Sequence, residues 1–133
     1  MARSRASARQ AGSRFERQVA DHLAAAVDDR IDRRVKTGSA DKGDIGGVRS
    51  AHGHRVVIEC KDVAVLNLAG WVREAEVERA NDGAVAGVVA HKRRGTSLIG
   101  AQYVTMTVDD LCALLTGVRP STAISGANTG GLE

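Results

Sequence analysis

Apolar positions recur along the chain at two spacings, one typical of helices and one of strands. Helical spacing starts at Phe15 and Val19 and predicts a first helix over residues 14–27. Ser13 is its predicted N-cap, and Glu16, three residues later, is the expected capping-box partner. Further helices are predicted over residues 68–81 and 109–115. Strands are predicted over residues 31–37, 44–48, 55–61, 84–90 and 102–108.

The second predicted helix has one apolar face and several acidic residues. Its packing face is formed by Trp71, Val72, Ala75 and Ala80. We expect the acidic residues Glu74, Glu76 and Glu78 to point largely to solvent, because buried carboxylates are rare unless they are paired.

The order of these elements predicts an α/β fold with a mixed β-sheet flanked by helices. Residues 84–90 form a continuous run of small apolar residues, typical of a strand covered on both faces. A chain of 133 residues is long enough for one domain. We place that domain at residues 13–116, between a basic flexible arm (1–12) and a disordered tail (117–133).

Composition adds information about partners. The net charge is +3, and most of the 19 basic residues are arginines gathered in clusters, which favours contacts with phosphates. A genome rich in G and C would also raise the arginine content. Aromatic residues make up 2% of the chain, which argues against a base-stacking platform for single strands. The two cysteines form no C-x-x-C pair, and no apolar run suits a signal peptide or a membrane span, so a soluble cytoplasmic protein is expected.

The strand over residues 55–61 carries the most informative chemistry. Alternation places Val56, Ile58 and Cys60 on one face and Val57, Glu59 and Lys61 on the other. Buried charges are costly unless they are paired or bind a metal. A hairpin with the preceding strand would bring Asp44 close to Glu59 and Lys61. Two carboxylates and a lysine suit a Mg²⁺ site that cuts phosphodiesters.

Each of these residues also has a purely structural interpretation. Glu59 and Lys61 could form an ordinary charge pair on an exposed sheet face. Asp44 could be a turn residue at the entrance to a strand, with Asp41 as a rival carboxylate in the loop. Glu16 could simply cap its helix.

Taken together, Glu16, Gly43-Asp44-Ile45 and Ile58-Glu59-Cys60-Lys61 resemble the motif of the PD-(D/E)xK nuclease superfamily. More narrowly, the chain resembles the small archaeal-type Holliday junction resolvases and their phage counterparts over residues 14–115. Gly43 stands where the family has proline. The resemblance implies a restriction-endonuclease-like three-layer core. It also implies a structure-selective endodeoxyribonuclease that hydrolyses phosphodiesters at four-way DNA junctions.

The resemblance assigns roles to individual residues. Asp44, Glu59 and the backbone carbonyl of Cys60 would bind Mg²⁺, with Mn²⁺ as a substitute. Lys61 would orient the attacking water or neutralise charge on the phosphate, and Glu16 would reach the site directly or through a water or a second ion. The products would carry a 5′-phosphate and a 3′-hydroxyl. Two symmetric cuts imply a C₂ homodimer acting on branched or duplex DNA, in a bacterial or phage-infected cell.

Basic clusters flank the expected site and would contact DNA phosphates. These candidates are Arg14, Arg33, Arg34, Lys36, Lys92, Arg93 and Arg94. They could equally be solvated loop residues. Two other functions stay open: a different nuclease of the superfamily that acts on flaps, ends or single strands, and a non-catalytic DNA-binding protein with a degenerate nuclease fold.

Overall fold

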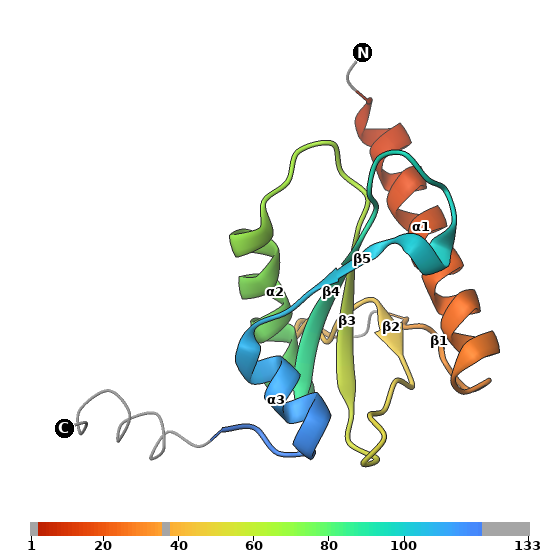
Figure 1. The fold of residues 1–133 in the computed structure, drawn as a ribbon. Helices are drawn as coiled ribbons and strands as arrows, with labels where there is room; N and C mark the ends of the chain where they lie inside the picture. Colours follow the sequence, from red (N-terminus) through yellow and green to blue (C-terminus); the bar gives the residue numbers. More distant parts are fainter. Residues whose placement is uncertain (1–2, 36–37, 121–133) are drawn as a thin grey trace.

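The computed structural model describes residues 3–35 and 38–120. The elements are α1 (Arg5–Ala26), β1 (Asp32–Arg33), β2 (Ile45–Gly46), β3 (Val56–Lys61), α2 (Leu68–Asp82), β4 (Ala86–His91), the 3-10 helix η1 (Ile99–Ala101), β5 (Tyr103–Thr105) and α3 (Val108–Thr116). The strands of the described residues form one sheet in chain order, in which β3 and β4 pair in parallel and the other pairs are antiparallel. The sheet lies between α1 and α2 (Figure 1). This confirms the predicted α/β class with a mixed sheet flanked by helices.

The first helix starts earlier than the sequence pattern predicted. Ser4 is its N-cap and accepts a hydrogen bond from the backbone N–H of Ser7. The predicted cap at Ser13 is therefore wrong, and residues 5–12 of the expected flexible arm are helical. Ala11 explains the extension: it lies one turn before Phe15 and is buried with it, so the apolar face of the helix continues toward the N-terminus.

The central parallel pair, β3 and β4, forms the core of the sheet. All six residues of β4 are buried, which confirms the strand predicted from the apolar run, although it lies at residues 86–91. The alternation predicted for β3 is also confirmed. Val56, Ile58 and Cys60 pack into the main core cluster with Phe15 and Val19 of α1. Glu59 and Lys61 face α2, because adjacent residues of a strand point to opposite faces.

A glycine brings α2 unusually close to the sheet. A Cβ atom at Gly87 of β4 would lie 2.7 Å from the carbonyl oxygen of Ala75 in α2. Trp71 and Ala75 pack against Val89 in this layer. This close approach brings Glu74 and Glu78 of α2 near Glu59 of β3.

The β2–β3 hairpin is shorter than predicted but has the predicted register. Ile45 lies opposite Ile58, and the backbone N–H of Asp44 donates to the carbonyl of Ile58 at 3.0 Å. Gly43, at φ +93°, allows this approach, because a Cβ atom there would lie 2.7 Å from Cγ1 of Val57. The strands predicted over residues 31–37 and 44–48 each contain two residues in regular pairing.

The last two helices agree with their predicted bounds to within about one residue. Gly83 ends α2 in a left-handed conformation, and Thr107 forms a capping box with Asp110 at the start of α3. The prediction for the faces of α2 needs two corrections: Ala80 is exposed, and Glu78 is buried. Gly117 ends α3, but the disordered tail expected from residue 117 does not begin there, because Arg119 donates to the carbonyl of Val85 and to Asp110. Residues 121–133 of the expected tail lie outside the described residues.

Candidate metal centre

Asp44 lies directly before β2, and a hydrogen bond from the backbone of β3 fixes the orientation of its carboxylate. The side chain is 7% exposed, and Oδ2 accepts a hydrogen bond from the backbone N–H of Cys60 at 2.8 Å. This bond ties Asp44 to β3 at the position after Glu59. The hairpin has thus brought Asp44 close to Glu59, with fourteen residues between them in the sequence, as the sequence predicted. Asp41, the rival carboxylate, instead accepts from the backbone N–H of Gly43 and shapes the turn.

Glu59 and Lys61 follow on the same face of β3. Glu59 is 7% exposed, so the interpretation as an exposed charge pair is wrong. The ammonium of Lys61 lies 3.4 Å from Oε2 of Glu59 and 3.1 Å from Oε1 of Glu74. Oε1 of Glu59 is buried and has no hydrogen-bond partner among the described residues. One carboxylate oxygen is therefore available to a ligand.

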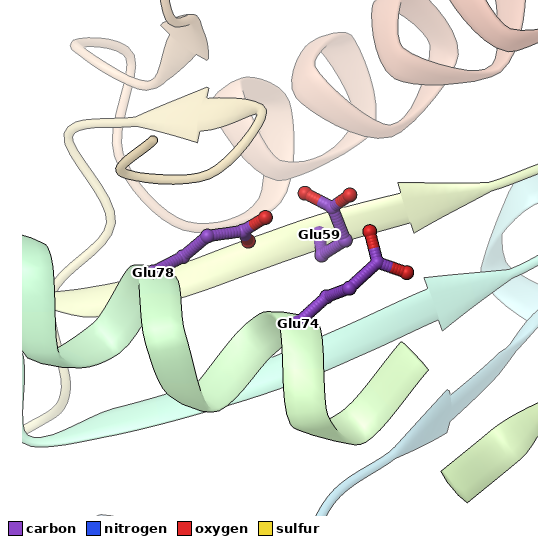
Figure 2. A group of neighbouring side chains, drawn as sticks. All are labelled: Glu59, Glu74 and Glu78. Carbon is purple, nitrogen blue, oxygen red and sulfur yellow. The ribbon is translucent and has the colours of Figure 1, made fainter. Parts of the chain in front are cut away.

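Helix α2 adds two carboxylates that the sequence analysis did not assign to the site. Glu74 and Glu78 point from α2 toward Glu59 on β3 (Figure 2). Glu78 is 3% exposed, and its Oε1 also lacks a partner among the described residues. The sequence held a signal for this burial, because Glu78 follows the buried Trp71 and Ala75 at helical spacing. We call Asp44, Glu59, Glu74 and Glu78 the carboxylate cluster.

Negative charge is crowded in the cluster, and the pKa values respond to it. Burial, followed by the charge of Asp44, raises the pKa of Glu59 to about 7. Burial, followed by the charge of Glu59, raises the pKa of Glu78 to about 10. Among the described residues, Lys61 forms ion pairs with Glu59 and Glu74 of the cluster. A single ammonium cannot balance four ionised carboxylates, so without a further cation some of them keep a proton.

The donor set fits a hard divalent cation. One oxygen from each of Glu59, Glu74 and Glu78 lies within 4.8 Å of the others. Carboxylate oxygens are the ligands preferred by Mg²⁺ and Ca²⁺. The two buried oxygens without partners, on Glu59 and Glu78, are the atoms that a cation would satisfy.

Cys60 contributes to the site through its backbone. Its side chain packs in the core on the α1 face, away from Glu59. Burial, followed by the charge of Asp44, raises the pKa of the Cys60 thiol. The thiol is therefore neutral and is not a suitable ligand. The assignment of its carbonyl as a metal ligand stays a prediction.

Glu16 approaches the site from the other side of the sheet. Because α1 starts at Arg5, Glu16 lies in the helix interior and has no capping role. Its Oε1 accepts from the guanidinium of Arg33 at 3.2 Å. Glu16, Arg33, Arg34 and Asp44 line one cavity of about 520 Å³. Glu16 therefore shares a space with Asp44, while Glu59 faces α2, from which Glu74 and Glu78 project.

The basic candidates form two groups. The first includes Arg14, Arg33 and Arg34: Arg14 and Arg33 line a groove beside α1, and Arg34 pairs with Asp82 at 3.6 Å. Lys36 lies outside the described residues. The second group, Lys92, Arg93 and Arg94, follows β4 and lines a cleft of about 610 Å³.

The second group adjoins the carboxylate cluster through the backbone. The N–H of Lys92 donates to the carbonyl of Lys61 at 3.0 Å. Arg93 stabilises its own loop: the guanidinium lies 4.5 Å above the ring of Tyr103 and donates to the carbonyl of Ala101. Lys92 and Arg94 are exposed and extend from this loop. These two side chains are the better candidates for contacts with phosphates.

No family model, curated protein or solved structure matches this chain. Among the described residues, the helices are too short or too polar to cross a membrane. The functional argument therefore rests on the geometry and chemistry of the cluster.

Proposed function

We propose that this protein is a metal-dependent endonuclease with a restriction-endonuclease-like core and a PD-(D/E)xK site. One observation carries the proposal: Asp44 and Glu59 are two buried carboxylates on paired strands, with Lys61 beside them and a carboxylate oxygen left without a partner. A fold in need of stability alone would gain little from this arrangement, because apolar residues of similar size would pack there at lower cost.

Asp44, Glu59 and the carbonyl of Cys60 would hold Mg²⁺ or Mn²⁺. When bound, the ion would supply an activated water and stabilise charge on the phosphate. Asp44 is fixed by its hydrogen bond with the N–H of Cys60, so its carboxylate keeps one orientation. Such fixed orientation is the main contribution that a protein makes to this kind of reaction.

Lys61 acts as a positive charge in this proposal. Burial tends to lower its pKa, but the hydrogen bond with Glu74 and the charge of Glu59 outweigh that effect and raise it. Lys61 therefore keeps its proton at neutral pH and is not a general base. In the absence of substrate its ammonium is held by Glu59 and Glu74, and a phosphate would compete with Glu74, the more exposed partner.

The proposed substrate is branched DNA, and a four-way junction is the favoured form. Lys92 and Arg94 lie on a loop whose backbone is hydrogen-bonded to that of Lys61. DNA phosphates that contact these two side chains would therefore lie next to the phosphate at the cleavage position. Resolution of a junction requires two equivalent sites, and a C₂ homodimer would provide them. The alternatives are a nuclease of this superfamily that acts on flaps, ends or single strands, and a DNA-binding protein without activity.

The test is cleavage of a labelled four-way junction beside a matched linear duplex, in Mg²⁺, Mn²⁺ or EDTA. The variants are Asp44→Asn, Glu59→Ala and the control Glu76→Gln, which neutralises an exposed carboxyl of α2 that pairs with Arg79. We expect paired nicks on the junction that require the metal. Loss of a direct ligand should reduce the rate by about two or more orders of magnitude, and Glu76→Gln should not.

The other outcomes distinguish the alternatives. Cleavage of linear DNA would favour the broader nuclease function over junction resolution. Metal-independent binding with no cleavage in any condition would refute the nuclease and favour the DNA-binding protein.

A further inference from the structure

Glu78 is a buried carboxylate that the proposed reaction does not yet use. It is 3% exposed, between α2 and the sheet, at a helix position where an apolar residue would pack with Trp71 and Ala75. Its Oε1 has no hydrogen-bond partner among the described residues. A buried carboxylate with an unsatisfied oxygen destabilises a fold, so its presence calls for a ligand or a proton.

The surroundings of Glu78 are acidic. Its carboxylate points toward Glu59, and Glu74, one turn earlier on α2, points to the same space (Figure 2). Lys61 is bonded to Glu74 and Glu59, at 3.1 Å and 3.4 Å. The ammonium therefore satisfies one side of the group. Oε1 of Glu59 and Oε1 of Glu78 receive no hydrogen bond from a donor among the described residues, and the two carboxyls lie at hydrogen-bond distance from each other.

We propose that Glu78, Glu59 and Glu74 bind a second divalent cation between α2 and β3. The first cation position, held by Asp44 and Glu59, belongs to the proposed function, on which this inference rests. Glu59 would then contribute to both positions. Two neighbouring cations that share a carboxylate are a recurrent arrangement in phosphodiester hydrolysis, where they stabilise the attacking and the leaving oxygens.

The spacing of the oxygens suits a divalent cation. Two ligands on opposite sides of an ion are about 4.2 Å apart for Mg²⁺ and about 4.6–5.2 Å apart for Ca²⁺, twice the metal–oxygen distance, and ligands on adjacent sides are closer. The oxygens of the three glutamates all lie within 4.8 Å of one another. Glu74 can adjust to the size of the ion, because its side chain is half exposed.

The competing explanation is that Glu78 keeps a proton and donates it to Glu59, with no cation between them. Both explanations satisfy the buried oxygens, but they differ in the number of cations that the protein binds. The experiment is isothermal titration calorimetry of the full chain with Mn²⁺ and with Ca²⁺. The variants are Asp44→Asn, Glu78→Gln and the control Glu76→Gln.

Wild type and Glu76→Gln are expected to bind two cations per chain. In Glu78→Gln one of them should weaken by more than about tenfold, while the other persists. In Asp44→Asn, binding of the cation held by Asp44 and Glu59 should weaken instead, while the cation between α2 and β3 persists. Thermal unfolding in EDTA checks the fold, and Glu78→Met is the second variant, because either substitution removes a buried carboxyl and should leave the metal-free protein at least as stable.

A wild-type stoichiometry of one, lost in Asp44→Asn and kept in Glu78→Gln, would overturn the second position and leave the proposed nuclease intact. Two cations retained in Glu78→Gln would also overturn it. Absence of any cation binding, together with absence of cleavage, would refute the proposed function as well.

Discussion

The carboxylate cluster should make the metal-free protein less stable as the pH rises. The carboxyl pKa is raised to about 7 at Glu59 and to about 10 at Glu78, mainly by burial, from an ordinary value of 4.5. Below the ordinary value, the folded and unfolded chains both hold these protons. Above it, the unfolded chain releases them while the folded chain keeps them, so the free energy of unfolding falls. The fall at Glu59 ends near its folded pKa, and that at Glu78 continues to higher pH.

The magnitude follows from proton linkage. Each extra proton held by the folded chain lowers the free energy of unfolding by at most about 1.4 kcal/mol per pH unit. Glu59 and Glu78 share a hydrogen bond and titrate as a pair, and the half-exposed Glu74 beside them lets solvent screen part of the effect. We therefore expect the pair to account for a loss of about 2 kcal/mol between about pH 5 and pH 7. A cation at 100 times its dissociation constant would restore about 2.7 kcal/mol at the higher pH.

The assay is urea unfolding in EDTA at several pH values, repeated with Ca²⁺. Glu78→Gln should flatten the pH dependence by about 1 kcal/mol per unit, because it removes one retained proton. Glu76→Gln is the matched control on the same helix. Hydrogen bonds with Arg79 lower the pKa of Glu76, so Glu76 contributes to the pH dependence of stability only at pH values below those of the experiment. The slope of the free energy of unfolding against pH should therefore not change in Glu76→Gln. A flat or rising stability of wild type over this range would refute the reasoning.

Two further predictions concern the elements around the cluster. Gly43→Ala should lower the free energy of unfolding by about 1–2 kcal/mol, because a Cβ atom would meet Val57 at a φ of +93°; equal midpoints for variant and wild type in urea unfolding would contradict this. The double substitution Lys92→Gln and Arg94→Gln should weaken DNA binding and reduce the slope of log K against log salt by about 2, one unit for each phosphate contact. An unchanged slope in a fluorescence anisotropy titration would place the DNA elsewhere, and Arg30→Gln, at an exposed site beyond α1, is the control.

The sequence by itself determined the features that depend on local periodicity. Alternation along residues 55–61 placed Glu59 and Lys61 on one face, because successive side chains of a strand must point to opposite sides. The predicted hairpin then placed Asp44 beside the strand of Glu59. In the structure Asp44 accepts a hydrogen bond from the backbone N–H of Cys60. The α/β class followed from the order of elements. The likeness to PD-(D/E)xK nucleases and the activity on junctions stay predictions.

Only the tertiary structure decided which helical residues join the site. Glu78 was expected at the surface, but Gly87 lets α2 approach β4 so closely that the turn beyond Ala75 is covered by the sheet. Glu16 lost its expected capping role, because α1 begins at Arg5, after the N-cap Ser4, rather than at the predicted residue 14 after Ser13. The physical reason is the same in both cases. Helical periodicity specifies a face, but the extent of the covered surface depends on the neighbours that pack against it.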